Sequence, residues 1–230
     1  MTEEEWLDCA DPAPMLRVVF GKARLRKLRL FAVACSQRIR HLVKDGQTLA
    51  ALGVAERFAD GLATDEERSA GRKAAAQAAQ GRDVIQTPTS PKWERRAASS
   101  VYYATADDAD KAAMAAGELA IESMIWLAGG HANCDSQAIK RTEQSQQAHL
   151  VRDVFGNPFR PVSVDPAWLT STVLALARGV YEDRAFDRLP ILADTLQDAG
   201  CEHPDLLGHL RSDGPHTRGC WALDLILGKE

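Results

Sequence analysis

The amino-acid sequence predicts an all-α protein, an irregular array or bundle of many helices that could divide into two lobes. Three observations support this prediction. Apolar residues recur at helical spacings of three and four, helix N-cap signals recur along the chain, and no segment of any length alternates apolar with polar residues as a half-buried strand does. With 230 residues and 45% hydrophobic content, the chain can build one sizeable core or two small ones.

The first helices are predicted from their N-terminal signals. Thr2 and Glu5 have the spacing of a capping box and predict a short helix over 3–9. Asp11 followed by Pro12 is an N-cap and first-turn signal for a second helix. The clearest helix is expected over about 23–43, because its apolar residues lie on one helical face. This stripe contains Leu28, Phe31, Cys35, Ile39 and Leu42.

A further helix is expected over about 47–59, and Thr64 with Glu67 forms another capping box before an alanine-rich helix that reaches about residue 80. The segment 81–94 contains two prolines and several Ser and Thr residues, which is typical of a long exposed loop. We therefore predict a boundary there, with an N-terminal lobe over 1–86 and a C-terminal lobe over 92–230. A single domain over 1–230 is the alternative.

The second half of the sequence predicts a series of helices with short connections. They are expected over about 93–103, 105–127, 136–155, 165–181, 187–199, a short stretch from Pro204, and 217–227. The helix over 105–127 has a stripe of mostly small residues, Ala112, Ala116, Leu119, Ser123 and Leu127, which would permit close helix approach. Pro158, Pro161 and Pro166 predict an extended or turned segment between the third and fourth of these helices.

Charge is unevenly distributed along the chain. The net charge is −4, yet residues 17–44 contain nine Lys and Arg and no acidic residue, so the remaining residues carry a net −13. The densest cations, at the start of the 23–43 helix, are the candidate partner-binding residues: Lys22, Arg24, Arg26, Lys27 and Arg29. Such a cationic surface could meet an acidic protein partner, acidic residues of the same chain, or nucleic acid. A sequence pI of about 5.9 is low for a dedicated nucleic-acid binder, so pairing with protein carboxylates is favoured.

Potential metal ligands concentrate near the end of the chain. Cys201, His203, His209, His216 and Cys220 lie within 20 residues, and thiolate and imidazole are the ligands that zinc prefers. The candidate metal site consists of Cys201, His209, His216 and Cys220, with His216 and Cys220 on one face if the last helix begins early enough to include both. The spacing matches no familiar zinc motif. The favoured alternative is therefore buried cysteines and a turn-forming His216, with no cofactor.

No catalytic residue is predicted. His131 and Cys134 could form a nucleophile pair, but Gly129 and Gly130 are explained equally by the end of a helix. Aromatic residues of the C-terminal third could line a pocket, although they more often form a core. The sequence contains no phosphate-binding glycine loop, HExxH, GxSxG or calcium loop.

The cysteines and the N-terminus predict a cytoplasmic protein. Five cysteines at irregular spacings do not suggest a disulfide framework, the acidic N-terminus is unlike a secretory signal, and no apolar run reaches the roughly 18 residues of a membrane-spanning helix. We therefore expect no membrane association.

The two ends of the chain resemble an uncharacterised family of bacterial proteins. The similar segments are MTEEEWLDCADPAPMLRVVFGKARLRKLRLFAVACSQRI at the start and, at the end, VFGNPFRPVSVDPAW, DRLPILADTLQDAGC and GPHTRGCWALDLILGKE. The family is one of planctomycete-type bacteria. The resemblance implies a recurrent helical module and no particular reaction.

Three functions follow as hypotheses. The first is a non-enzymatic interaction or adaptor module that docks a protein partner through its basic helix. The alternatives are a zinc-binding protein, structural or hydrolytic, built on the C-terminal Cys/His cluster, and nucleic-acid binding through the basic helix.

Overall fold

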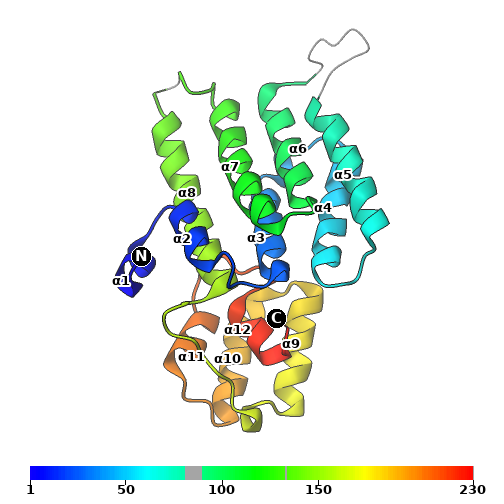
Figure 1. Ribbon diagram of the computed structural model, residues 1–230. Helices are drawn as coiled ribbons and strands as arrows, with labels where there is room; N and C mark the ends of the chain where they lie inside the picture. Colours follow the sequence, from blue (N-terminus) through cyan, green and yellow to red (C-terminus); the bar gives the residue numbers. More distant parts are fainter. Residues whose placement is uncertain (81–89, 133, 230) are drawn as a thin grey trace.

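A computed structural model describes residues 1–80, 90–132 and 134–229. These residues form twelve α-helices and three short 3₁₀-helices and contain no β-strand, which confirms the predicted all-α class (Figure 1). The α-helices are α1 (Glu3–Asp8), α2 (Pro12–Val19), α3 (Leu25–Arg38), α4 (Gly46–Ala59), α5 (Asp65–Gln80), α6 (Lys92–Ala104), α7 (Ala109–Leu127), α8 (Ser136–Phe155), α9 (Ser171–Asp183), α10 (Leu189–Asp198), α11 (Pro204–Leu210) and α12 (Trp221–Leu227). The 3₁₀-helices are η1 (Arg40–Leu42), η2 (Pro166–Trp168) and η3 (Phe186–Arg188).

Several helix starts coincide with their capping signals. Thr2 and Glu5 form a reciprocal capping box at α1, in which each side chain accepts a hydrogen bond from the other residue's backbone N–H. Thr64 and Glu67 do the same before α5. At α2, the Asp11 carboxylate accepts from the Ala13 N–H. These local hydrogen bonds satisfy backbone donors that have no partner within the helix.

Two of the predicted helices are shorter in the structure. The helix expected over 23–43 ends at Arg38, and η1 follows it; Ile39 and Leu42 stay buried because the 3₁₀ turn continues to direct them into the core. The helix expected from 105 begins at Ala109, after Asp108 caps it by accepting from the Lys111 N–H.

Two C-terminal helices begin later than predicted. Asp165 and Pro166 start only η2, and α9 begins at Ser171, where the Thr170 hydroxyl accepts from the Val173 N–H. The last helix was expected from 217 but begins at Trp221, because residues 217–219 form a turn.

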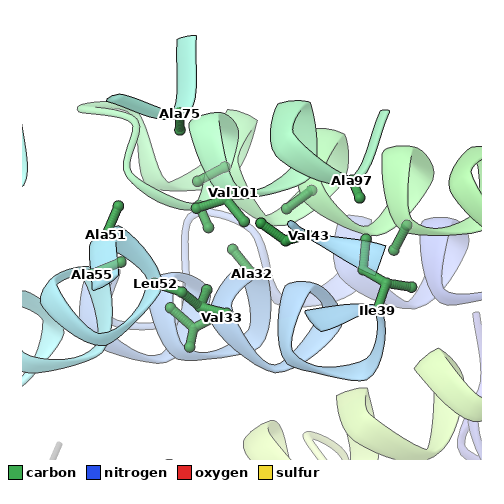
Figure 2. Close-up of a cluster of buried hydrophobic side chains, with 14 of the residues drawn as sticks. Ala32, Val33, Ile39, Val43, Ala51, Leu52, Ala55, Ala75, Ala97 and Val101 are labelled. Atoms are coloured by element: carbon green, nitrogen blue, oxygen red, sulfur yellow. The ribbon is translucent and has the colours of Figure 1, made fainter. Parts of the chain in front are cut away.

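The first hydrophobic core lies between α3, α4, α5, α6 and α7 (Figure 2). It is built largely from alanine and valine, which lets the helices approach closely. On α7, Ala112, Ala116 and Ser123 are buried as predicted, whereas Leu127, the last residue of the helix, is 46% exposed.

This core extends across the predicted boundary between 86 and 92. Ala51 and Ala75 precede that boundary, Ala97 and Val101 follow it, and all four belong to the same buried cluster. The cause is that α6 packs against both α5 and α7. Residues 81–89 of the predicted loop lie outside the described residues, and Lys92–Glu94 already belong to α6.

A second cluster joins α1, α2 and α3 to α7 and α8, and a third lies among α9, α10, α11 and α12. Val180, Leu192, Leu196, Leu210 and Leu223 are fully buried members of this third core. The cores therefore divide after α8, and Figure 1 shows α9–α12 gathered at one end of the α3–α8 bundle. None of the described helices combines the length and apolar character needed to cross a lipid bilayer.

Candidate metal centre

Four side chains with metal-ligating atoms meet where α8 reaches the C-terminal helices. They are Asp153, His209, His216 and Cys220, and their ligand atoms all lie within 4.8 Å of one another. Asp153 and Cys220 are buried, and the side chains of His209 and His216 are 17% and 7% exposed. A buried Asp/His/His/Cys group of this kind could hold a metal ion.

Three segments position these donors. Asp153 lies in the last turn of α8, and His209 lies in the last turn of α11. His216 and Cys220 lie in the connection that leads into α12, where Cys220 is the N-cap residue. The cluster thus joins the end of the α3–α8 bundle to the α9–α12 subdomain.

The connection before α12 is held in place locally. The Thr217 N–H donates to Asp153 Oδ2 at 2.9 Å, and the Cys220 N–H donates to the Thr217 carbonyl at 3.0 Å. Gly219 has φ +92°, and a Cβ there would lie 2.9 Å from Leu30 Cδ1. Glycine therefore allows both the left-handed turn and the close approach to α3 that bring Cys220 to the cluster.

Three of the six distances between the ligand atoms are close to those of a tetrahedral site. His216 Nδ1 is 2.9 Å and His209 Nε2 is 3.2 Å from Asp153 Oδ1, and His209 Nε2 is 3.2 Å from Cys220 Sγ. With metal bonds of about 2.0–2.3 Å, the edges of a zinc tetrahedron are about 3.3–3.8 Å. Adjustments of a few tenths of an ångström at these close pairs would admit an ion.

His216 lies between two hydrogen-bond acceptors. Its Nε2 is 3.1 Å from the Ser212 carbonyl oxygen, while its Nδ1 faces Asp153 Oδ1. If Nε2 carries the only proton, the Nδ1 lone pair points at a carboxylate oxygen, which is repulsive. If Nδ1 carries the proton instead, it donates to Asp153, but the Nε2 lone pair then faces the Ser212 carbonyl oxygen. Either neutral tautomer therefore leaves one repulsive contact, which a second proton removes and which a metal ion at Nδ1 also removes when Nε2 carries the proton.

The electrostatics of the cluster depend on its burial. Burial favours the neutral form of Asp153, but its hydrogen bonds to His209 and His216 and their positive charges outweigh burial and lower its pKa. Burial likewise opposes protonation of His216, yet the bond to Asp153 raises the pKa of its imidazole. Burial and the nearby Asp153 carboxylate raise the pKa of the Cys220 thiol well above its ordinary value.

The same geometry argues against a Cys-His-Asp nucleophile. In such a triad the acid orients the histidine through the ring nitrogen opposite the one that faces the nucleophile. Here Asp153 and Cys220 both contact His209 Nε2. A fully buried thiol with a raised pKa is also a poor nucleophile, because the thiolate is the reactive form.

The structure brings together three of the four residues of the sequence-predicted site. His209, His216 and Cys220 converge, but Cys201 is buried in the α9–α12 core and does not belong to the group of four. Its place is taken by Asp153, which lies more than 50 residues before His209 and was not predicted. One sequence signal was present: Asp153 is the acidic residue within the apolar end of α8, next to Val151 and Val154, which are both buried.

The helical condition for this convergence is not met. His216 and Cys220 would share a helical face only if the last helix included both, but α12 begins after Cys220. The two meet because the turn over 217–219 folds back, a feature that helical periodicity does not describe. His203, the N-cap residue of α11, also lies outside the group of four.

Several of the candidate partner-binding residues near the start of α3 contact carboxylates and backbone carbonyls of the same chain. Arg26 forms ion pairs with Asp60 at 2.9 Å and with Asp224 at 2.7 Å, and Lys27 also pairs with Asp224. Arg29 donates to the backbone carbonyls of residues 106 and 107. Lys22 is exposed, and Arg24 is the N-cap residue of α3.

The other sequence candidate, His131, is exposed near the end of α7. Its Nε2 is 3.1 Å from Glu122 Oε2, and its ring packs edge-on against Trp126 at 5.7 Å. Gly129 and Gly130 have positive φ and follow the helix end, as predicted for the non-catalytic alternative. Cys134 is exposed.

No protein-family model matches the chain, and neither a curated protein nor a solved structure matches it significantly. The fold and the cluster define an all-α protein with a buried Asp/His/His/Cys group.

Proposed function

We propose that the protein binds zinc at Asp153, His209, His216 and Cys220, and that the ion has a structural role. One carboxylate, two imidazoles and one thiol form a donor set typical of zinc. The observation that carries the proposal is the convergence of these four donors, with all ligand atoms within 4.8 Å, from three separate segments.

The contacts around the donors support this proposal. A histidine that binds a metal usually donates its other ring N–H to a carbonyl or carboxylate, which fixes the tautomer. The Ser212 carbonyl, 3.1 Å from His216 Nε2, is suited to that role. Asp153 Oδ2 accepts a hydrogen bond from the Thr217 N–H. This leaves Oδ1, which faces both imidazoles, as the oxygen that would bind the metal ion.

A structural role is favoured over a hydrolytic one. Catalytic zinc sites typically use three protein ligands and keep a fourth position open for water or substrate. Here the chain supplies four donors, and two of them, Asp153 and Cys220, are at most 3% exposed. Zinc bound by all four would deprotonate the Cys220 thiol and offset the buried negative charge of Asp153.

The position of the site indicates what the ion would stabilise. Asp153 belongs to α8, whereas His209, His216 and Cys220 belong to the segment that ends with α12. Zinc would hold the α9–α12 subdomain against the end of the bundle. Since the unfolded chain lacks such a preformed site, the binding free energy would add directly to the stability of the folded state.

Metal analysis tests the proposal. We expect untagged protein, purified without chelator from zinc-supplemented cells, to carry about one zinc per chain. At free zinc a thousand times the Kd, binding stabilises the folded state by about 4 kcal/mol. For a chain of this size, removing that zinc should lower the Tm by about 8–16 °C. Less than about a tenth of a zinc per chain, together with no uptake of added zinc, would contradict the proposal.

The chain offers a matched pair of variants. Cys201 and Cys220 are both fully buried, so Cys201→Ser and Cys220→Ser should perturb packing similarly. We expect Cys220→Ser to weaken zinc binding at least about tenfold and Cys201→Ser to leave it within about twofold, because even residues that only support a ligand change metal affinity 10–100-fold. Equal zinc affinity in the two variants would exclude Cys220 as a ligand.

A further inference from the structure

A groove of about 960 Å³ lies between the bundle and the α9–α12 subdomain. It is lined by α1, the ends of α2 and α8, the start of α3, the segment over 156–162, and residues of α11 and α12. Its volume is at the upper end of the range for ligand pockets. The sequence analysis did not predict this groove.

The groove combines apolar side chains with an excess of positive charge. Phe155 and Trp221 contribute partly exposed aromatic surface, and the fully buried Trp6 packs beneath the groove. The lining contains six cationic side chains, Lys22, Arg24, Lys27, Arg152, Arg160 and Lys229, and three acidic ones, Glu3, Asp205 and Asp224. The lining therefore carries a net +3, whereas the whole chain carries −4.

Some of this positive charge is not neutralised by carboxylates in the groove. Arg152 donates to the backbone carbonyls of residues 6, 7 and 9 and forms no ion pair there. Lys22 is exposed, and the Lys229 ammonium lies over the Tyr181 ring at 4.5 Å. The three acidic side chains of the groove already have cationic partners: Asp224 pairs with Arg26 and Lys27, and Arg160 pairs with Glu3 at 3.0 Å and with Asp205 at 4.0 Å. The groove thus favours an anionic ligand.

We propose that this groove binds an acidic peptide segment of a partner protein, with carboxylates toward the cations and apolar side chains on the aromatic surface. Lys22, Arg152 and Lys229 come from three separate parts of the chain, so they suit several anionic groups along an extended ligand better than a single head group. At such interfaces, a few central aromatic residues commonly contribute most of the binding free energy.

Two other polyanionic partners fit this groove less well. Nucleic acid carries a closely spaced row of phosphates that needs a continuous cationic surface, whereas Arg160 in this groove is already paired with Glu3 and Asp205. An anionic membrane surface is broad, whereas peripheral membrane binding uses apolar groups that insert into the bilayer. Here the aromatic residues line a concave surface between two subdomains.

Selection from a random dodecapeptide display library, on the full chain with zinc present, tests this inference. We expect the enriched peptides to be acidic and to contain aromatic or aliphatic residues. Synthetic copies should bind in solution with an affinity that falls as salt rises, because the cations are partly exposed to solvent. No enrichment, or enrichment of neutral or basic peptides, would overturn the proposal. So would tighter binding of an oligonucleotide or a phosphatidylserine vesicle.

Two matched pairs of variants locate the binding site. Lys22→Glu in the groove and Lys73→Glu on α5 reverse one exposed charge each, and Leu7→Ser and Leu62→Ser each remove an exposed leucine, of which only Leu7 lines the groove. We expect Lys22→Glu to weaken binding of a selected acidic peptide at least about tenfold, and Leu7→Ser several-fold, while each control stays within about twofold. Circular dichroism and zinc content verify that all four fold. Zinc content is measured separately from peptide binding. A protein that binds no acidic peptide but carries about one zinc per chain would therefore contradict the groove proposal and leave the zinc proposal standing.

Discussion

At the scale of single residues, Arg26 shows how the basic segment is used. Its guanidinium pairs with Asp60 and Asp224 and donates to the Tyr181 hydroxyl at 2.8 Å. Burial opposes its charge, but the bond to Asp224 outweighs burial and raises the pKa of Arg26. Buried charges are tolerated when they are paired and hydrogen-bonded in this way. The cation excess of the sequence is therefore partly an internal network that connects α3, α4, α9 and α12.

Tyr181 provides a pH-dependent test of that network. Burial and the hydrogen bond from its hydroxyl to Asp60 at 2.6 Å raise the pKa of Tyr181 above its ordinary value. Tyr181→Phe should cost about 1–3 kcal/mol at neutral pH, because it leaves Asp60 and Arg26 with unmet hydrogen bonds. A raised pKa in the folded state means that this contribution is full below about pH 10 and is lost as the pH rises through the folded value.

Urea unfolding of the wild type and Tyr181→Phe at a series of pH values measures this effect. We expect the difference in unfolding free energy between the two proteins to shrink above about pH 10. A difference that stays constant or grows with pH would show that Tyr181 does not ionise with a raised pKa.

At the scale of helices, α7 shows how small residues set the packing of the bundle. Ala112, Ala116 and Ala120 are fully buried against the neighbouring helices. Gln147 of α8 donates to the Gly117 carbonyl at 3.0 Å, and a Cβ at Gly117 would lie 2.8 Å from its Oε1. The alanine-rich face is therefore used within the chain, which the sequence analysis could not distinguish from packing against another copy.

We expect Ala116→Leu to destabilise the protein by about 1–3 kcal/mol, because the added side chain has no space between α7 and its neighbours. Leu127→Ala, at the exposed end of the same helix, should change the stability by less than about 0.5 kcal/mol. Urea denaturation with an unchanged m-value measures both. Similar costs for the two substitutions would contradict the close packing of α7.

At the scale of the whole molecule, the α3–α8 bundle and the α9–α12 subdomain have separate cores. Asp224 of α12 pairs with Arg26 and Lys27 of α3, and the metal cluster joins α8 to the segment that precedes α12. Ion pairs and the proposed zinc site thus connect bodies that hydrophobic packing alone would join weakly.

Removal of zinc should consequently loosen one part of the chain. We expect hydrogen exchange to accelerate in α11, in α12 and in the last turn of α8 after chelation, while the amides of α4–α7 keep their protection. The reason is that all four donors lie at 153 or beyond, whereas the core of the bundle contains no ligand. Uniform loss of protection, or loss confined to the bundle, would contradict a zinc ion that holds the subdomain in place.

The sequence by itself determined the helical class and many helix starts, because capping boxes and apolar spacings act over only three or four residues. It also indicated His209, His216 and Cys220 through their chemistry. Tertiary structure alone decided that Asp153 completes the cluster in place of Cys201, that the cores divide after α8, and that Asp60 and Asp224 meet Arg26. These results depend on contacts between residues far apart in the chain, which no local pattern encodes.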